Sequence, residues 1–261
     1  MTRGIWFVGQ KYLNKLLFFA KKTIFVFHIK ICMFMPKVSL NQVLDESKLF
    51  SFLTKEQKQK ISDNSTHLRY KKGETICKQG AFANHIMVIT EGLAKTYLEG
   101  ANDKNLIIDI LKPVSWIGLS STYNENTYNF TAATIIDSSI CFIEKTVFTD
   151  ILLENNEFSN DIIGKLCRSS KHFFNKITSL GNKQLHGRFA DALLYLSQKV
   201  AKSPTIELSI TRKEIGELAG ISTESAIRLL SELNHDGIIQ LDGKVITILK
   251  ENLLEKLSKI G

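Results

Sequence analysis

The sequence predicts an α+β protein in which an antiparallel, jelly-roll-like β-roll is followed by a long helix and a C-terminal winged helix-turn-helix. Short apolar runs separated by glycine-containing turns are typical of an antiparallel barrel or sandwich. Apolar residues then recur at spacings of three and four, as in a helix with a continuous seam. Two short amphipathic helices and an Asp-Gly hairpin signal complete the pattern near the C-terminus.

Length and composition fit two globular domains joined by a helix. The 261 residues are 44% hydrophobic and 23% charged, which is ordinary globular usage. We expect an N-terminal extension over 1–35, a β-roll over 36–157, a long helix over 158–181 and a winged helix-turn-helix over 182–261. The formal charge of +8 is uneven, because residues 1–35 hold six basic residues and no acid, which leaves +2 for the rest. Bulk charge is therefore a weak indication of a nucleic-acid partner.

The N-terminal 35 residues have two interpretations. The apolar run at 16–20 is cut short by Lys21 and Lys22, so it is too short for the roughly 20 residues of a membrane span. We favour a native start at Met33 or Met35, with the upstream residues non-native or disordered. The alternative is a basic amphipathic surface anchor, for which aromatic residues among the lysines are the motivation.

The region from Pro36 to Glu157 has the sequence pattern of a β-roll. Apolar runs at 86–89, 106–108, 110–111 and 140–143 alternate with turn signals. Those signals are the pairs 72–73, 79–80, 91–92, 102–103 and 112–113. A helical leader over 40–64 is expected to pack against the strands.

The long helix is expected over 159–181, with a bend at 181–182 and a continuation over 188–199. Its seam consists of Ile163, Leu166, Ser170, Phe173, Ile177 and Leu180. Such a seam fits a two-stranded coiled coil and hence a homodimer. The alternative is a helix that packs only on its own β-roll.

The helix-turn-helix is predicted from its caps and its buried stripes. Thr211 and Glu214 form a capping-box pattern, and Gly220 ends the first helix. Ser222 can cap the second helix, whose buried stripe is Ala226, Leu229, Leu230 and Leu233. The Asp-Gly pair at 242–243 lies between apolar runs and predicts a small β-wing.

The outward face of the second helix carries residues that suit base recognition. Glu224 and Arg228 are four apart and share one face, so Arg can reach guanine acceptors and Glu the cytosine amino group. The alternative is an ordinary exposed ion pair between them. The remaining candidates for DNA contact are Ser222, Thr223, Ser225, Arg212, Lys213, Lys244 and, for phosphate alone, Lys183.

Residues 208–248 resemble the DNA-binding domain of the Crp/Fnr transcription regulators. The resemblance implies a non-enzymatic, cytoplasmic homodimer that binds an inverted repeat in double-stranded DNA, works with RNA polymerase and responds to an effector. In the family, a Glu and an Arg four residues later read the G·C pair of a TGA-like half-site, and here they are Glu224 and Arg228. Thr223 and Ile227 depart from the residues that the cyclic-AMP and oxygen branches place there.

The resemblance also places a phosphate cassette at 116–118. Cyclic-nucleotide binders follow Gly118 with a Glu and place an Arg about ten residues later, but here Leu119 and the segment 128–131 occupy those places. No basic residue lies between Gly118 and Lys145, which disfavours cyclic AMP or GMP because a buried phosphate needs a cationic partner. The expected effector pocket comprises Gly118, Leu119, Tyr128, Asn129, Phe130, Thr131, Phe173 and Phe174.

The cysteines and histidines do not form a recognisable cofactor set. The four cysteines, at 32, 77, 141 and 167, contain no C-x2-C element, which disfavours the iron–sulfur cluster of the oxygen-sensing branch. Scattered thiols also fit a reducing cytoplasm. His172 and His186 lack partners at metal-ligand spacing, so we expect no metal site, although haem stays open. The alternative function is a ligand- or haem-binding β-roll whose helices serve protein–protein interaction.

Overall fold

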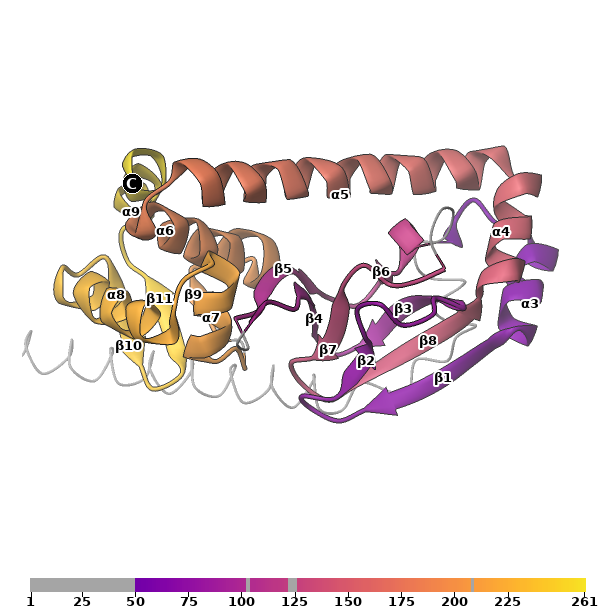
Figure 1. The fold of residues 1–261 in the computed structure, drawn as a ribbon, viewed down its shortest axis with the longest axis horizontal. Coiled ribbons are helices and arrows are strands. Elements are labelled where there is room, and N and C mark those ends of the chain that lie inside the picture. Colours follow the sequence, from indigo (N-terminus) through magenta and orange to yellow (C-terminus); the bar gives the residue numbers. More distant parts are fainter. Residues whose placement is uncertain (1–49, 102–103, 122–125, 208) are drawn as a thin grey trace, which may run out of the picture. The chain divides into compact units, whose positions relative to one another are not determined.

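The computed structural model describes residues 50–101, 104–121, 126–207 and 209–261. The predicted N-terminal extension, its two interpretations and the first part of the helical leader lie outside these ranges. Within them the predicted classes of element follow one another along the chain in the expected order (Figure 1). The fold is α+β, with antiparallel sheets, a long helix and a C-terminal helix-turn-helix with a small sheet.

The β-roll consists of two four-stranded antiparallel sheets. The first has the order β1-β8-β3-β6 and the second β2-β7-β4-β5. The strands are β1 (Ser65–Tyr70), β2 (Thr75–Cys77), β3 (His85–Glu91), β4 (Ala94–Leu98), β5 (Leu106–Leu111), β6 (Ser115–Ile117), β7 (Thr131–Thr134) and β8 (Ser138–Glu144). Strand β3 lies between β8 and β6 and buries five consecutive residues, so it is the centre of the first sheet.

Apolar side chains between the sheets form the core of the roll. Met87 and Ile89 of β3, Ile117 of β6 and Ile140 of β8 are almost fully buried in one cluster. The turn before β4 needs glycine at position 92, where φ is +93° and a Cβ would lie 2.2 Å from the Ser138 hydroxyl oxygen. That turn was predicted from sequence, but its steric cause is a contact made by a distant residue.

Helix α4 (Lys145–Glu154) contacts β3 and β8 of the first sheet, and helix α3 (Lys55–Asp63) contacts α4. Helix α3 begins after Thr54, whose hydroxyl accepts a hydrogen bond from the Gln57 backbone N–H at 3.2 Å in a capping box. In the described part of the leader predicted over 40–64, the α-helix is Lys55–Asp63 and Phe50 is in a 3-10 turn. Thr54 fixes the start of α3 because its cap satisfies the first free N–H groups.

Helix α5 (Asn156–Asn182) is the longest element of the described chain, at 27 residues or roughly 40 Å. It begins three residues before the predicted start, because the Asn155 side chain accepts the Phe158 N–H and caps it. The chain then turns at Lys183, and α6 (Leu185–Tyr195) continues as the π-helical segment η4 (Leu196–Ala201). The predicted second part, 188–199, thus starts too late and misses the π-helix.

The C-terminal unit has a three-stranded sheet of order β10-β11-β9 and a helix-turn-helix. Its elements are β9 (Thr205–Ile206), α7 (Arg212–Ala219), α8 (Thr223–His235), β10 (Ile239–Asp242), β11 (Val245–Ile248) and α9 (Glu251–Ile260). Asp242 pairs with Val245 across the predicted Asp-Gly turn, in which Gly243 has φ +58°. Helix α9 packs on α6 and was not expected from the sequence.

Strands β4 and β5 of the roll contact helices α5, α6 and α7 through polar groups. The Lys95 ammonium of β4 lies 3.0 Å from a Glu214 carboxylate oxygen and 3.7 Å from one of Glu217, both on α7. The Ile110 N–H of β5 donates to the Tyr195 hydroxyl of α6 at 2.9 Å. The three charged side chains are at most 16% exposed, so this cluster is a largely buried ion network.

The two carboxyl groups of the cluster have different environments. Burial alone would raise the pKa of Glu214, but hydrogen bonds from the Thr211 N–H and from Lys95 lower it overall. Burial raises the pKa of Glu217 in spite of the nearby Lys95 and Lys213. One buried carboxylate oxygen of Glu217 also has no hydrogen-bond partner. Glu217 is thus the less well satisfied of the two acids.

We expect Glu217→Gln to stabilise the protein near pH 7 by about 1 kcal/mol, because it removes a poorly satisfied buried charge. The folded chain holds the Glu217 proton more tightly than the unfolded chain, so wild-type stability should fall as pH rises from 4.5 through the raised pKa. Urea unfolding between pH 4.5 and 8 measures both effects. Glu255→Gln, an exposed position on α9, is the control. A Glu217→Gln curve parallel to that of wild type would contradict this account.

Candidate nucleic-acid interface

The start of helix α8 is fixed by local hydrogen bonds. Ser222 is its N-cap and accepts the Ser225 N–H at 3.2 Å, while the two serine hydroxyls lie 3.1 Å apart. Gly220, at φ +65°, ends α7 and allows the tight turn between the helices. A Cβ at Gly220 would lie 2.6 Å from a terminal methyl group of Leu180 of α5, which would have to shift, so the positive φ is the main reason for glycine here. The first turn of α8 is therefore presented in one defined orientation.

The outward face of α8 carries the predicted base-reading pair. Ala226, Leu229, Leu230 and Leu233 are buried, as predicted, whereas Glu224 and Arg228 are exposed. Thr223 and Ser225 are half-buried beside them. Hydrogen bonds from its own N–H and from the Ser222 hydroxyl lower the pKa of Glu224. Glu224 is thus an anionic acceptor at neutral pH.

Arg228 has a partner other than the one considered from the sequence. Its Nε atom lies 3.6 Å from an oxygen of Glu232, and the other oxygen of Glu232 lies 3.3 Å from His186 of α6. The ion pair considered from the sequence was Glu224 with Arg228. In the structure Arg228 pairs with Glu232, one helical turn further along α8. Sequence reasoning missed Glu232, although its spacing of four from Arg228 was the available signal.

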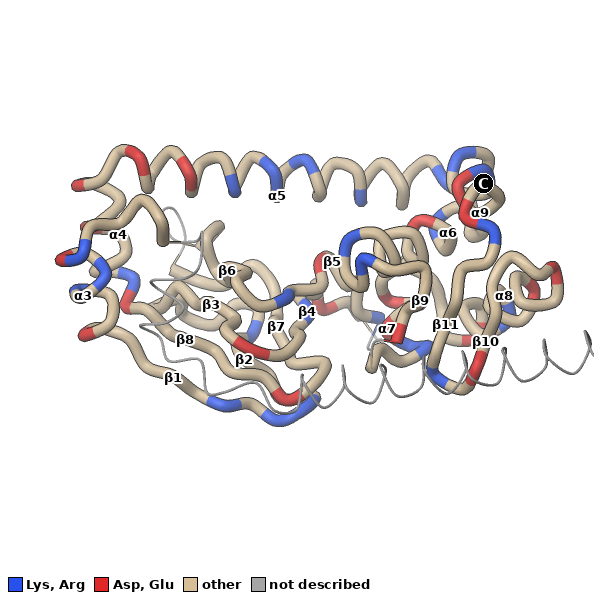
Figure 2. Tube along the Cα trace, turned by 180° about the vertical axis from the view of Figure 1, so that it is seen from behind, with Lys and Arg blue, Asp and Glu red and all other residues tan. Residues whose placement is uncertain are grey.

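The predicted phosphate-facing cations separate into two groups. Arg212 and Lys213 are exposed at the start of α7, and Lys244 is exposed in the wing, where an Arg212 guanidinium nitrogen donates to the Gly243 carbonyl at 3.3 Å. Basic positions mark this part of the trace in Figure 2. Lys183 does not join them. Its ammonium is 2.8 Å from Asp191 and 3.2 Å from the Ser258 hydroxyl, so an internal acid already satisfies it.

The predicted seam of α5 lies open in the single chain. Ile163, Phe173 and Ile177 are 56%, 41% and 65% exposed. Ser170 is exposed, while Leu166 and Leu180 are half-buried. Within α5 only Phe158 and Ile162 are buried. A stripe of apolar side chains along most of this helix is thus left without cover by the described part of its own chain.

The residues predicted for an effector pocket differ in burial and in hydrogen bonding. Tyr128 is buried, and its hydroxyl donates to the His85 carbonyl at 2.8 Å. Burial raises the pKa of Tyr128 to about 12. The Thr131 hydroxyl donates to Glu99 at 2.7 Å. Gly118 is buried, Leu119 and Phe130 are half-buried and Asn129 is exposed. Phe173 and Phe174 lie exposed on α5.

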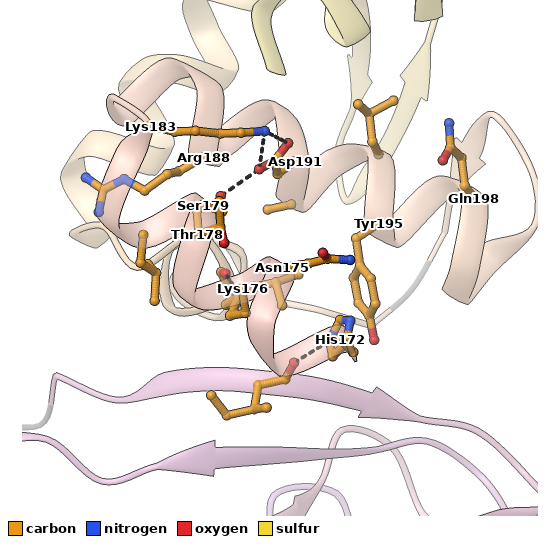
Figure 3. Close-up of a pocket in the computed structure, with 16 residues that line it drawn as sticks. His172, Asn175, Lys176, Thr178, Ser179, Lys183, Arg188, Asp191, Tyr195 and Gln198 are labelled. Atoms are coloured by element: carbon orange, nitrogen blue, oxygen red, sulfur yellow. Dashed lines mark hydrogen bonds and ion pairs between the residues drawn. The ribbon is translucent and has the colours of Figure 1, made fainter. Parts of the chain in front are cut away.

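A cavity of about 410 Å³ lies where α5, α6, α7 and β5 meet (Figure 3). Ser179, Lys183 and Asp191 form a hydrogen-bonded chain on one side, and His172 contacts the Ile108 carbonyl at 2.9 Å on the other. Burial lowers the pKa of Lys176, which donates to the Leu218 carbonyl, to about 8. No cassette residue lines this cavity. Its lining comes from separate elements, so no motif in the sequence predicts it.

The cofactor expectations can be compared with the described residues. Cys77 and Cys141 are buried in strands, and burial raises the pKa of each thiol to about 12, whereas Cys167 is exposed. In the ranges that the structure describes, no group of three or more His, Cys, Asp or Glu side chains forms a candidate metal site. Among the same residues, no helix is both long and apolar enough to cross a membrane.

Two family descriptions match the chain. The cyclic nucleotide-binding domain matches residues 67–155, and the Crp-like helix-turn-helix domain matches residues 187–257. The chain belongs to the Crp/Fnr family. It is accordingly a DNA-binding transcription regulator and not an enzyme.

Relatives and solved structures agree with this assignment. The chain is 25% identical over 207 residues to the "Probable transcriptional regulator flp" of Lacticaseibacillus casei, covering 79% of this chain and 94% of that protein. It is 22% identical to the CRP-like cAMP-activated global transcriptional regulator of Mycobacterium tuberculosis, covering 69% of this chain and 82% of that protein. FixK2 of Bradyrhizobium japonicum shares the fold, with a TM-score of 0.68 at 22% identity over 74% of this chain and 96% of that one.

Proposed function

We propose that this regulator is a homodimer that recognises an inverted repeat by placing helix α8 of each copy in a major groove. The observation that carries the proposal is the exposed pair of Glu224 and Arg228 on the first turns of a helix whose opposite face is buried. Recognition helices contact base edges with their N-terminal residues. Arg228 would bind guanine acceptors and Glu224 the cytosine amino group of one G·C pair.

The surroundings of α8 support contacts to the DNA backbone. Arg212 and Lys213 at the start of α7 and Lys244 in the wing are cations on separate elements of the same unit. Phosphate contacts fix position and orientation without reading sequence. Ser222, Thr223 and Ser225 lie at the first turn of α8, where hydroxyl groups can also reach phosphate or base. We assign the DNA contact to these residues together.

Helix α5 supplies the two-fold partner in this proposal. Its exposed Ile163, Phe173 and Ile177 continue a spacing that suits a coiled-coil seam. A second copy would cover this stripe and bring two winged helices into a symmetric arrangement. We therefore assign 158–181 to dimerisation, 36–157 to sensing and 182–261 to DNA binding. The regulator would act in the cytoplasm and contact RNA polymerase.

We infer that the effector is neither cyclic AMP nor cyclic GMP and that the iron–sulfur set is absent. Leu119 and Asn129 stand where the family's cyclic-nucleotide binders place an acid and a cation. The groups at the cassette that could bind phosphate are few, and Thr131 and Tyr128 already have partners within the roll. The effector itself is unidentified, and the pocket that we assign to it is formed by the cassette residues and the Phe173–Phe174 part of α5.

Arg228→Ala should weaken binding by about 1–3 kcal/mol and relax the preference at one G·C pair in each half-site. Glu224→Ala should relax the same pair with a smaller loss, because it also removes repulsion from phosphate. Selection from a random DNA library should return an inverted repeat with centres about 10–11 bp apart or a multiple. Lys213→Ala is the control and should weaken all sequences alike with a flatter salt dependence. An unchanged motif in the Arg228 and Glu224 variants would refute the base-reading role.

Ile177→Asp should convert the dimer to monomers and lower DNA affinity at least 100-fold. An unpaired carboxylate buried in the seam costs several kcal/mol, and each 1.4 kcal/mol is a factor of ten. Sedimentation velocity and DNA titration measure the two effects. Ile260→Asp, at an 85% exposed position of α9, is the matched control and should leave both unchanged. Dimers of normal strength in the Ile177 variant would place the interface elsewhere.

Calorimetry with cyclic AMP or cyclic GMP should show no binding below the millimolar range. The reason is that no basic residue lies between Gly118 and Lys145 to pair with the cyclic phosphate. The variant Asn129→Arg tests the reason, since it restores a cation in the cassette. Micromolar affinity of the wild-type protein would show that the cassette has been misplaced.

A further inference from the structure

A second cavity, of about 330 Å³, lies between the start of α7, the wing and the turn that joins β1 to β2. Its floor is apolar and its rim is cationic. The apolar side chains are Ile210, Ile215, Leu230 and Ile246, and the cations are Lys72, Arg212, Lys213 and Lys244. None of the described residues that line it is acidic. The volume is at the lower end of the roughly 300–1,000 Å³ of small-molecule sites.

The cations of the rim are poorly compensated. Among the described residues, Lys72, Arg212 and Lys244 have no carboxylate oxygen within 4.0 Å. Lys213 lies 3.8 Å from Glu217, a carboxylate that also lies 3.7 Å from Lys95. Four like charges around one concave surface create a positive potential that attracts anions. The cavity therefore favours a ligand with a negative group at its mouth.

Lys72 is held in place by its own backbone. Its N–H donates to a carboxylate oxygen of Asp137 at 2.9 Å, and the other oxygen of Asp137 receives the Lys71 ammonium at 3.1 Å. Asp137 is thus occupied by the neighbouring residue and by a backbone group. The Lys72 side chain remains free to line the cavity, and its position on the β-roll makes it the only rim cation outside the proposed DNA contact.

The apolar floor decides what kind of anion fits. Ile210 is half-buried, whereas Ile215, Leu230 and Ile246 are almost fully buried. A ligand that covers Ile210 displaces water from hydrocarbon surface. A fully hydrated inorganic anion would gain nothing from that surface. A carboxylate with a short hydrocarbon body can place its charge on the rim and its chain on the floor.

We propose that this cavity binds a small amphipathic organic anion, such as a medium-chain carboxylate, and that the bound ligand excludes DNA. The exclusion rests on the proposed function, because Arg212, Lys213 and Lys244 are the cations assigned to the DNA backbone. A ligand that neutralises them removes the phosphate contacts of α7 and the wing together. Through Lys72 it also ties both elements to the β-roll.

Binding is tested with octanoate below its micellar concentration, using isothermal calorimetry on the full-length protein. We expect affinity in the micromolar to low millimolar range for octanoate and at least tenfold weaker binding of 1-octanol and octylamine, which share the chain but not the charge. Lys72→Gln should weaken octanoate binding about three- to tenfold. Lys71→Gln, the neighbouring residue that pairs with Asp137 and does not line the cavity, should have no effect.

Competition is tested by titrating octanoate into the complex with labelled DNA. We expect octanoate to lower DNA affinity in the wild-type protein and in Lys71→Gln, with a weaker effect in Lys72→Gln, while DNA affinity without octanoate stays equal in all three. The proposed site is overturned if octanoate does not bind, if 1-octanol binds equally well, or if the two lysine variants behave identically. Octanoate binding that leaves DNA affinity unchanged would overturn the exclusion. The Arg228 variant separately reports whether the DNA-reading role itself fails.

Discussion

A buried ion network around Lys95 links the helix-turn-helix to the β-roll, beside an apolar cluster in which Ile107 and Ile110 of β5 share a core with Ile215 and Leu218 of α7. This one cation lies between Glu214 and Glu217, and Glu214 is also the residue that completes the N-terminal cap of α7. The position of the first helix and the position of strand β4 are therefore not independent. Hydrogen bonds from Ile110 to Tyr195 and from His172 to the Ile108 carbonyl add two further ties from β5. Strands β4 and β5 therefore carry contacts from the roll to α5, α6 and α7.

Local signals made the DNA-binding unit predictable from sequence. The Thr211–Glu214 capping box, the Ser222 cap and the Asp242–Gly243 turn each depend on residues within a few positions of one another, and the structure contains all three. The same is true of the helix α5 seam, which is a periodic pattern. In each case the residues that define the element lie within a few positions of one another along the chain.

The parts that sequence missed are set by contacts between distant residues. The π-helical end of α6 and the packing of α9 on α6 have no local signature. Lys183 looked like a surface cation, but Asp191 and Ser258 satisfy it, and neither is near it in any motif. Lys72 and Lys95 lie on the roll and reach the helix-turn-helix only through the fold. The composition of both cavities could therefore be known only after the elements were assembled.

The pairing of Arg228 with Glu232 has a consequence for discrimination between DNA sequences. An arginine that already has an anionic neighbour gains little by meeting a phosphate or a mismatched base, since it exchanges one weak partner for another. A guanine that offers two acceptors at once is a clearly better partner. In the proposed complex the Glu232 carboxylate would compete with the DNA for Arg228, so only a better partner than Glu232 would displace it.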